Sequence, residues 1–314
     1  MRKSFIAVIA GLLASAAALA APAEGKQKLL WDHLAGAIAA IEARLDGALG
    51  VAILDLGTGQ QLLVHADEVF PTASSIKIAV LAELYHQSEQ SAHGVAGKAR
   101  LADLYIVRQQ DLVPDSDVLG GLTPGVTRLT NRDLATIMVA VSDNSATNVL
   151  IDRVGMDNVQ KLTASLGLPH TQLRRKMMDL KAASEGRENI ATPRELMQLL
   201  EQLYRGKLIA PPLLDDFFTV LATHKDSWLP RNLPEDLKVA DKPGSLEGVR
   251  NDSGIVFLKE RPYVISVMTS YLASERAGEE AISQISLEAF RMFDRLGRAS
   301  EYGRVISPSN GTVR

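Results

Sequence analysis

Apolar residues recur every three or four positions near both ends of the chain. This spacing predicts amphipathic helices over 28–44 and 277–296, with Gly297 as the stop of the second helix. Shorter runs of apolar and β-branched residues predict strands. These runs are 50–54, 60–65, 237–240, 254–258 and 263–270. The first two flank a glycine-containing turn and therefore predict a β-hairpin.

Helical patterns dominate the middle of the chain, from Pro71 to about Leu221. The clearest predicted helices in this part are 131–141, 144–154 and 193–204. Thr192 and Pro193 are typical of the cap and the first position of the third helix. Because strands lie toward both ends and helices lie between them, the pattern predicts one α/β unit. In this unit the two ends of the chain share a sheet, and an all-helical lobe at about 70–221 is inserted.

The first twenty residues are typical of a secretory signal peptide. Arg2 and Lys3 precede an apolar stretch, and small residues surround a cleavage position near Ala20. Residues 1–20 are therefore predicted to be removed, which places the mature protein in the periplasm or outside the cell. A membrane anchor is the alternative, but the apolar run is short and no charge follows it. Residues 299–314 are predicted to form a flexible tail, because Ser, Pro, Asn and Gly are frequent there.

The composition is that of an ordinary globular protein, with 46% hydrophobic and 23% charged residues and no cysteine. The net charge is −3, and it becomes more negative when two basic residues leave with the signal peptide. Such a chain lacks the basic surface that nucleic-acid binding requires. The six histidines have no paired zinc-site spacing, and the glycine-rich stretches have no phosphate-loop pattern. Neither a metal nor another cofactor is therefore expected.

Ser74 and Lys77 lie three positions apart at the start of a helix predicted over 74–87, so their side chains share one face. A serine hydroxyl is a poor nucleophile until a base takes its proton, and a lysine that burial keeps uncharged can be that base. The free N–H groups at a helix start also favour negative charge on a bound carbonyl. Alone, this pair is weak evidence, because a helix cap followed by a solvated lysine explains it as well.

Two further motifs follow in order along the chain. Ser142-Asp143-Asn144 lies between two predicted helices, where a hydroxyl can relay a proton and an amide can bind a carbonyl, although a helix cap explains it too. Lys242-Pro243-Gly244 follows a predicted strand, where a lysine can hold a carboxylate and a glycine lets a backbone approach closely. Because proline cannot donate to a ladder, this strand is predicted to be an edge strand or to end there.

The three motifs together, in this order and in these contexts, are far more specific than any one of them. With them the chain resembles the class A β-lactamase and penicillin-binding serine hydrolase family. The resemblance also includes the stretches 141–148 and 254–256. It implies one catalytic domain over 27–298, in which an antiparallel sheet flanked by helices packs on the helical lobe. The active site is then expected between the two lobes.

The resemblance implies an acyl-enzyme mechanism. Ser74 is expected to be acylated by the carbonyl of a β-lactam ring, with the oxyanion held by the N–H groups of Ser74 and Ser245. Lys77 is expected to be the base or proton relay, and Ser142 is expected to pass a proton to the leaving nitrogen. Substrate contacts are implied for Asn144, Lys242, Gly244, Ser245 and Arg250. Among these, Lys242 is expected to bind the substrate carboxylate with the help of Arg250.

One loop departs from the family pattern. Family β-lactamases carry a glutamate and, four residues later, an asparagine, which together hold the water that releases the acyl group. Matching 173–181 to that loop places Met177 and Lys181 at these two positions. A thioether cannot usefully take a proton from water, so deacylation is expected to be slow or to use another base. Three nearby acids are expected to be structural instead: Asp179, Glu185 and Glu188.

Three functions remain open at this point. The first is β-lactam hydrolysis. The second is a D-Ala-D-Ala peptidase or esterase, which shares the three motifs and does not need the loop glutamate. The third is a non-catalytic sensor that captures β-lactams or peptidoglycan fragments. In each case the expected partner is a small β-lactam or peptidoglycan-like molecule, with no nucleic acid and no stable membrane anchor, and the protein is expected to be a monomer.

Overall fold

In the computed structural model, the described residues are 25–300 and 302–305. The predicted signal peptide, 1–20, lies outside them, as do residues 301 and 306–314 of the predicted tail. Within the described part of that tail, Ala299 pairs with Val305 in an isolated bridge. None of the helices in the described part is long and apolar enough to cross a membrane.

Both ends of the chain contribute strands to a five-stranded antiparallel sheet with the order β2-β1-β9-β8-β7. Its strands are β1 (Ala48–Asp55), β2 (Gln61–Val64), β7 (Val239–Leu246), β8 (Val249–Val256) and β9 (Tyr263–Ser270). The N-terminal β1 pairs with the C-terminal β9 along eight residues, from Ala48 opposite Ser270 to Asp55 opposite Tyr263. The predicted hairpin and the predicted sharing of one sheet by the two chain ends are therefore confirmed.

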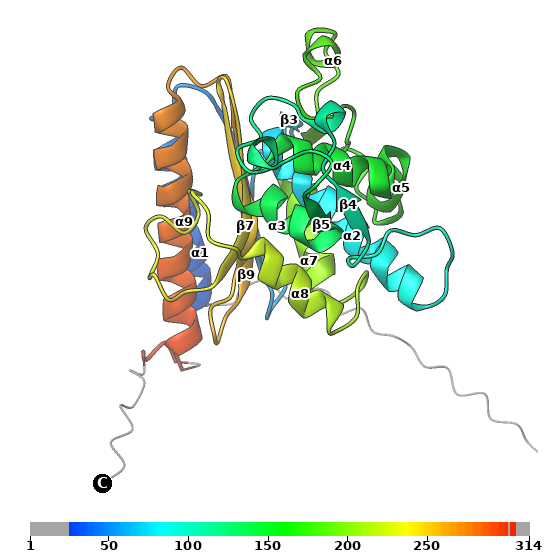
Figure 1. The fold of residues 1–314 in the computed structure, drawn as a ribbon. Helices are drawn as coiled ribbons and strands as arrows, with labels where there is room; N and C mark the ends of the chain where they lie inside the picture. The colour runs from blue at the N-terminus through cyan, green and yellow to red at the C-terminus, as the bar shows by residue number, and fades with distance from the viewer. Residues whose placement is uncertain (1–24, 301, 306–314) are drawn as a thin grey trace, which may run out of the picture.

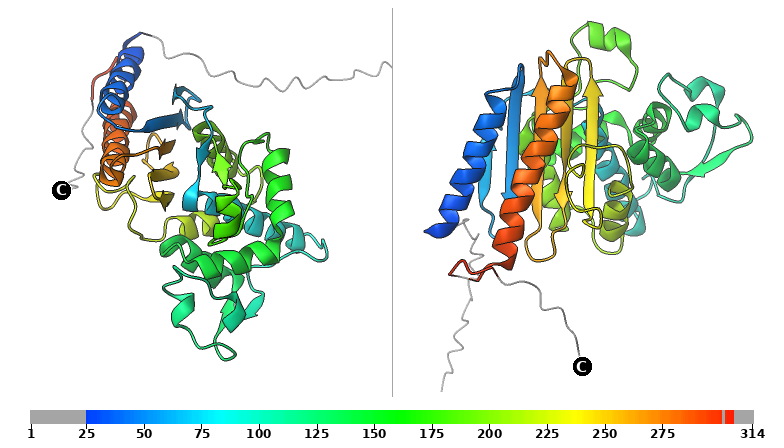
Figure 2. Two further views of the ribbon diagram at one scale, coloured as in Figure 1. Left: turned by 90° about the horizontal axis from the view of Figure 1, so that it is seen from above. Right: turned by 90° about the vertical axis from the view of Figure 1, so that its left-hand side faces the viewer.

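Two helices cover one face of this sheet, as Figures 1 and 2 show: α1 (Lys26–Glu42) and α9 (Glu275–Arg298). Trp31 of α1 meets Phe293 of α9 edge to face, and Ile38 and Ile265 are fully buried in the same core. The predicted stop at Gly297 is wrong, because α9 continues through it. A Cβ there would lie 3.3 Å from the Cβ of Glu260, so this glycine serves close packing against the β8–β9 loop.

The opposite face of the sheet packs on the helical lobe, which Figure 1 shows around the central α2. The helices of this lobe are α2 (Lys77–Ala92), α3 (Asn131–Ala140), α4 (Asn144–Val154), α5 (Met156–Ser165), α6 (Leu180–Ser184), α7 (Pro193–Tyr204) and α8 (Leu213–Leu221). Three predicted helices match α3, α4 and α7 to within a residue. Thr192 caps α7 as predicted, since its hydroxyl accepts from Glu195 N at 3.1 Å. Short strands pair elsewhere, namely β3 (Phe70–Pro71) with β6 (Ile190–Ala191) and β4 (Leu104–Ile106) with β5 (Arg128–Thr130).

Two features of the fold bring the three motifs together. The helix predicted from residue 74 begins instead at Lys77, because a 3₁₀ turn, η1 (Ala73–Ile76), precedes it and carries Ser74. The outer strand β7 runs past this turn, and its position at the end of the sheet confirms the predicted edge strand. The alternative that the strand ends at Pro243 is wrong, since β7 continues to Leu246.

Candidate active site

The turn that carries Ser74 is held against β7 by close backbone contacts. The hydroxyl of Ser75 donates to the carbonyl of Lys242 at 3.1 Å. A Cβ on Gly244 would stand 2.6 Å from Thr72 O and 3.0 Å from Ser74 N, so only glycine allows β7 to come this near. The close approach that Gly244 permits is therefore to the chain's own turn, whereas the sequence predicted an approach by substrate.

Ser142 lies in the junction between α3 and α4 and makes the central hydrogen bonds of the site. Its hydroxyl donates to Ser74 Oγ at 2.9 Å and accepts from Lys77 Nζ at 2.9 Å and from Lys242 Nζ at 3.2 Å. Its φ angle of 57° is one that residues other than glycine adopt rarely, and Ala73, beside the nucleophile, has a φ of 48°. Strained backbone on both sides of one contact is typical of a functional site.

Lys77 is buried at the start of α2 and donates three hydrogen bonds. They go to Ser142 O at 2.6 Å, Ser142 Oγ at 2.9 Å and Asn144 Oδ1 at 3.1 Å. Burial, with the positive charge of Lys242, lowers the pKa of Lys77 well below the usual range, and Asp143 opposes this shift. The hydrogen bonds among the described residues thus run from Ser74 to Lys77 through Ser142, where the sequence suggested direct contact.

Lys242 reaches the same point from β7. Its ammonium donates to Ser142 Oγ at 3.2 Å and to Pro243 O at 3.1 Å. Burial and the charge of Lys225 lower its pKa to about 8, while Asp241 and a second buried carboxyl oppose the shift. The carboxylate of Asp241, the residue before Lys242, accepts a hydrogen bond from Lys225 Nζ at 3.3 Å through Oδ1.

A cavity of about 600 Å³ opens beside these side chains, between the helical lobe and the free edge of β7. Its walls include Ser74, Ser142, Asn144, Lys242, Pro243, Ser245, Asp115, Asp117, Lys225, Asp226, Trp228 and Glu279. A smaller cavity of about 140 Å³ adjoins it and shares Ser74, Asn144 and Ser245. Five of the predicted site residues therefore line one cavity or both, and Lys77 lies directly behind the wall.

The register of β7 decides where the backbone of Ser245 points. β7 pairs with β8, and next to this ladder Phe257 N donates to Lys238 O at 3.0 Å, so these two opposite residues form a hydrogen-bonded pair. In an antiparallel ladder, hydrogen-bonded and non-hydrogen-bonded residue pairs alternate. Ser245, opposite Arg250, falls at a non-bonded position, and its N–H therefore points to the free edge of β7. Pro243 occupies a position of the same kind, which explains how a residue without an N–H lies inside this strand.

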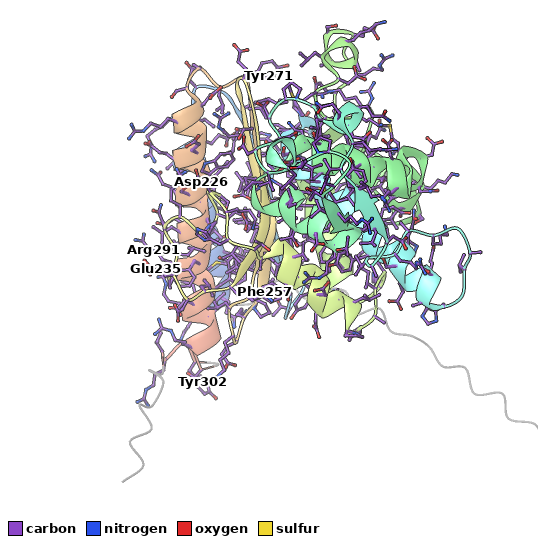
Figure 3. The ribbon with its side chains drawn as sticks, in the orientation of Figure 1. Asp226, Glu235, Phe257, Tyr271, Arg291 and Tyr302 are labelled. Carbon is purple, nitrogen blue, oxygen red and sulfur yellow. The ribbon has the colours of Figure 1, made fainter. Side chains whose placement is uncertain are left out.

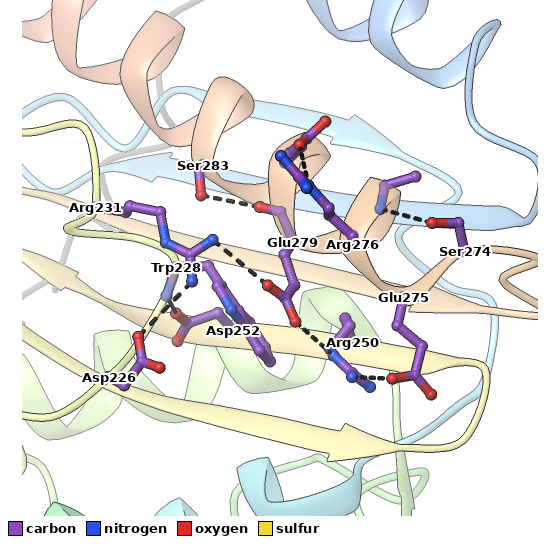
Figure 4. A network of polar contacts seen from close by, with 12 residues as sticks. Asp226, Trp228, Arg231, Arg250, Asp252, Ser274, Glu275, Arg276, Glu279 and Ser283 are labelled. Carbon is purple, nitrogen blue, oxygen red and sulfur yellow. Dashed lines mark hydrogen bonds and ion pairs between the residues drawn. The ribbon is translucent and has the colours of Figure 1, made fainter.

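Arg250 does not join the other predicted site residues. Figure 4 shows its guanidinium between Glu275 and Glu279 of α9, with Nε 3.1 Å from Glu279 Oε1. Its Nη1 donates to two backbone carbonyls, and the group packs over the ring of Trp228 at 5.8 Å. Both carboxylates form ion pairs with Arg250, and Arg250 does not line the large cavity. Arg250 is therefore not placed to bind a substrate carboxylate together with Lys242.

The loop between α5 and α7 carries apolar side chains toward the small cavity. Met177 is buried there. Its backbone N donates to Asn148 Oδ1 at 2.9 Å, and its carbonyl accepts from Asn148 Nδ2 at 3.0 Å. Lys181 lies on α6, which projects from the body of the molecule in Figure 1, and its side chain is exposed. The nearby acids have structural partners, as expected: Asp179 caps α6, Glu185 pairs with Arg187, and Glu188 pairs with Arg175.

Sequence reasoning missed the wall residues that come from outside the three motifs. Lys225 and Trp228 follow α8 in an irregular segment, and Glu279 lies on α9. Asp226, labelled in Figure 3, has a side chain that is 95% exposed at the cavity mouth. No local pattern distinguishes these residues from ordinary surface residues, because only the folding of two separate segments brings them to one cavity.

Comparisons with known proteins identify similar chains and similar folds. The model of the "Beta-lactamase enzyme family" matches residues 33–293. Beta-lactamase SME-1 of Serratia marcescens is 26% identical to this chain, and the match covers 84% of this chain and 90% of SME-1. Beta-lactamase Toho-1 of Escherichia coli is 29% identical, and the match covers 89% of this chain and 92% of Toho-1. The crystal structure of a β-lactamase from Sphaerobacter thermophilus is 33% identical with a TM-score of 0.74, covering 83% and 97%. A point mutant of PBP-A, solved as an acyl-enzyme complex with penicillin G, is 25% identical with the same TM-score, covering 84% and 97%.

Proposed function

The chain belongs to the beta-lactamase enzyme family, and from this premise we propose that it is a serine hydrolase that opens β-lactam rings through an acyl-enzyme at Ser74. One observation carries the proposal. A continuous hydrogen-bonded path joins Ser74 to Lys77 through Ser142, beside a cavity large enough for a small molecule. A nucleophile that hydrogen-bonds to a proton relay, which in turn contacts a buried lysine, is the arrangement that acyl transfer requires.

Acylation follows this path. In the structure Lys77 Nζ donates to Ser142 and Ser142 Oγ donates to Ser74, so these hydrogen bonds reverse when Lys77 is in its uncharged form. The Oγ of Ser74 then attacks the ring carbonyl carbon while its proton passes to the hydroxyl of Ser142, which releases its own proton to the amine of Lys77. Burial lowers the pKa of Lys77 well below the usual range, which favours the uncharged amine that this transfer needs. When the ring C–N bond breaks, the same proton returns through Ser142 to the leaving nitrogen. The proton balance then closes, with an ester at Ser74 and a new N–H on the opened ring.

The developing oxyanion has two donors in this proposal. The N–H of Ser245 points to the free edge of β7, and Ser74 N lies in the turn against that edge. Fixed N–H groups that face a developing negative charge stabilise the transition state, because they need no reorganisation when the charge appears. The close fit of Gly244 against the turn at Ser74 holds these two donors at a fixed separation.

Release of the acyl group is proposed to be slow. Met177 occupies the position at which the family pattern places a general base, and it contributes only apolar surface to the small cavity. The acids of the same loop are held in a helix cap or in ion pairs, which makes them poor replacements for that base. The lifetime of the ester at Ser74 is therefore expected to be much longer than the time that acylation takes.

Intact-mass measurement after mixing with penicillin G tests this function. We expect the protein to gain the mass of one penicillin within seconds and to lose it over minutes or longer. The Met177→Glu variant is expected to keep this long lifetime, because Lys181 is exposed on the projecting α6 and cannot help to hold a water. If the unmodified protein shows no adduct and no turnover, the proposal is wrong. Fast release from Met177→Glu would contradict the account of the loop.

The alkaline limit of the reaction is expected near pH 8 for substrates that carry a carboxylate. Lys242 is protonated below its pKa of about 8 and then attracts the anion, and this attraction is lost as the pH rises through that value. Burial lowers this pKa most, Lys225 lowers it further, and Asp241 and Asp252 raise it. The measurement is kcat/KM, or the acylation rate constant, against pH for penicillin G and its methyl ester. Only the free acid should lose activity above pH 8, and identical profiles would contradict the assignment.

Met177 also favours a second candidate function, a D-Ala-D-Ala peptidase or esterase, since such enzymes share the three motifs without the loop glutamate. Release of D-alanine from a cell-wall peptide, with a long-lived penicillin adduct, distinguishes it from a β-lactamase.

We also infer export, from the signal-peptide pattern of residues 1–20. N-terminal sequencing of the secreted protein would test that inference, with a new terminus expected near residue 21.

A further inference from the structure

Four large apolar side chains gather around the small cavity beside Ser74. Met177 and Met178 line it from the loop before α6, and Leu180 is the first residue of α6. Leu246 lines it from the end of β7. Leu180 is 67% exposed and Leu246 is 36% exposed. Large apolar side chains that meet at one open hollow, instead of lying scattered over the surface, indicate a binding surface.

The polar side chains of this cavity are mostly bound to the protein itself. Asn189 is buried, and its Oδ1 accepts from the backbone N–H groups of Arg174 and Arg175 at 2.7 and 3.0 Å. Its Nδ2 donates to Arg175 O at 3.1 Å. The guanidinium of Arg175 pairs with Glu188 at 2.8 Å, so these two charges cancel. Of the described residues on this wall, one further residue is titratable, the exposed Asp115, and it adds a carboxylate.

The position of Ser142 decides which part of the substrate faces the small cavity. In the proposed reaction Ser142 returns a proton to the leaving nitrogen, and both Ser142 and Lys242 line the large cavity but not the small one. The leaving group therefore belongs in the large cavity. Because Ser74 lines both cavities, the carbon on the other side of the acyl carbonyl, with its substituents, faces the small cavity.

We propose that the four apolar side chains form an acyl-group site, which selects substrates whose acyl group carries an uncharged, apolar substituent such as an aryl ring. The inference rests on the proposed function in taking acylation at Ser74 as the reaction. Such a substituent removes apolar surface of the two exposed leucines from water, which favours its binding.

Charged substituents are disfavoured in the acyl-group site. An anion faces the carboxylate of Asp115, and the guanidinium of Arg175 is already paired with Glu188. An ammonium gains little from Asp115, because this carboxylate is exposed to water and the attraction is screened there. Either charge must also leave water to enter a wall of apolar side chains.

The experiment compares four penicillins that share the ring system and the side-chain amide. In 6-acetamidopenicillanic acid the acyl side chain ends in a methyl group, and in penicillin G it ends in a phenyl ring. Ampicillin adds an ammonium to the phenyl-bearing side chain, and carbenicillin adds a carboxylate. The second-order rate constant of acylation is measured by intact mass. We expect penicillin G to react about tenfold faster than the acetamido compound, and faster than both charged compounds.

Two variants and a matched control assign this preference to the acyl-group site. Leu180→Asn exchanges an exposed leucine for a polar residue of similar size, and we expect it to reduce the tenfold ratio to about threefold while the acetamido rate stays nearly unchanged. Leu246→Asn tests the β7 side in the same way and serves if Leu180→Asn disturbs α6. Leu29→Asn, at a leucine of α1 that is 58% exposed and lines neither cavity, is expected to change no rate.

The outcomes separate this inference from the proposed function. Equal rates for penicillin G and the acetamido compound, or faster acylation by ampicillin or carbenicillin than by penicillin G, would overturn the inference and leave the proposed function in place. If none of the four acylates the protein, the proposed reaction is wrong, and their dissociation constants decide about the cavity. A preference for penicillin G that Leu180→Asn reduces then supports the apolar site, and equal binding overturns it.

Discussion

Replacement of Ser74 by alanine abolishes the covalent adduct with penicillin G and lowers kcat/KM by at least about 10³-fold. The expected loss is this large because the only acyl acceptor of the proposed reaction disappears. The hydroxyl that remains nearest, that of Ser142, is hydrogen-bonded to two lysines and is held by a backbone of unusual φ, so it cannot move to replace the missing nucleophile. A loss of about 10³-fold corresponds to about 4 kcal/mol of transition-state stabilisation.

The neighbouring serine provides the control for this prediction. Ser75 lies in the same 3₁₀ turn, and its hydroxyl faces the carbonyl of Lys242 instead of the cavity. Ser75→Ala is therefore expected to form the adduct at a rate within a few-fold of the unmodified protein, with a modest loss of stability from one buried hydrogen bond, about 1 kcal/mol. Intact mass and thermal melting are measured on both variants. A penicillin adduct on Ser74→Ala would place the nucleophile elsewhere.

Replacement of Lys77 by methionine slows acylation by about 10²- to 10⁴-fold, the usual contribution of a general base. The nucleophile, the cavity and Lys242 all remain, so the adduct is still expected to form, but slowly. Methionine has a similar length and removes only the amine that ends the proton path. The rate of adduct formation at a fixed penicillin concentration is the measurement, and it separates this variant from Ser74→Ala, which should form none.

Lys77→Arg separates two roles that a lysine can have here. An arginine keeps the positive charge and the hydrogen bonds to the junction between α3 and α4, but it does not release its proton in proteins. We therefore expect Lys77→Arg to be as slow as Lys77→Met. If Lys77→Arg acylates at nearly the normal rate, position 77 supplies only a charge, and the proton of Ser74 must leave by another route, for which Lys242 is the nearest amine to Ser142 Oγ.

The strained residues mark the same site independently of any motif. Ala73, Asp115, Ser142 and Met178 have positive φ angles, and each lines one of the two adjoining cavities. Such conformations cost free energy and persist only where the surrounding structure enforces them. Their concentration around Ser74 indicates that the backbone is shaped to present the hydroxyls of residues 74 and 142 to one another.

The sequence alone predicted the main helices and strands and the candidate reacting groups. Alternation and helical spacing are local properties, so β1, α4, α7 and β9 could be predicted closely from them. The three motifs predicted Ser74, Lys77 and Lys242 as site residues, because the chemistry of these motifs depends on residue type and on order along the chain. The sequence also indicated that the acids near Met177 have structural roles, as their ion pairs confirm.

Only the tertiary structure decided which of these groups touch. It placed Ser142 between Ser74 and Lys77, engaged Arg250 with two glutamates of α9, and brought Lys225 beside Lys242. These contacts join segments that are far apart in the chain. Whether a charged side chain faces a cavity or an opposite charge depends on strand register and on the nearest competing partner, and neither is encoded in any short stretch of sequence.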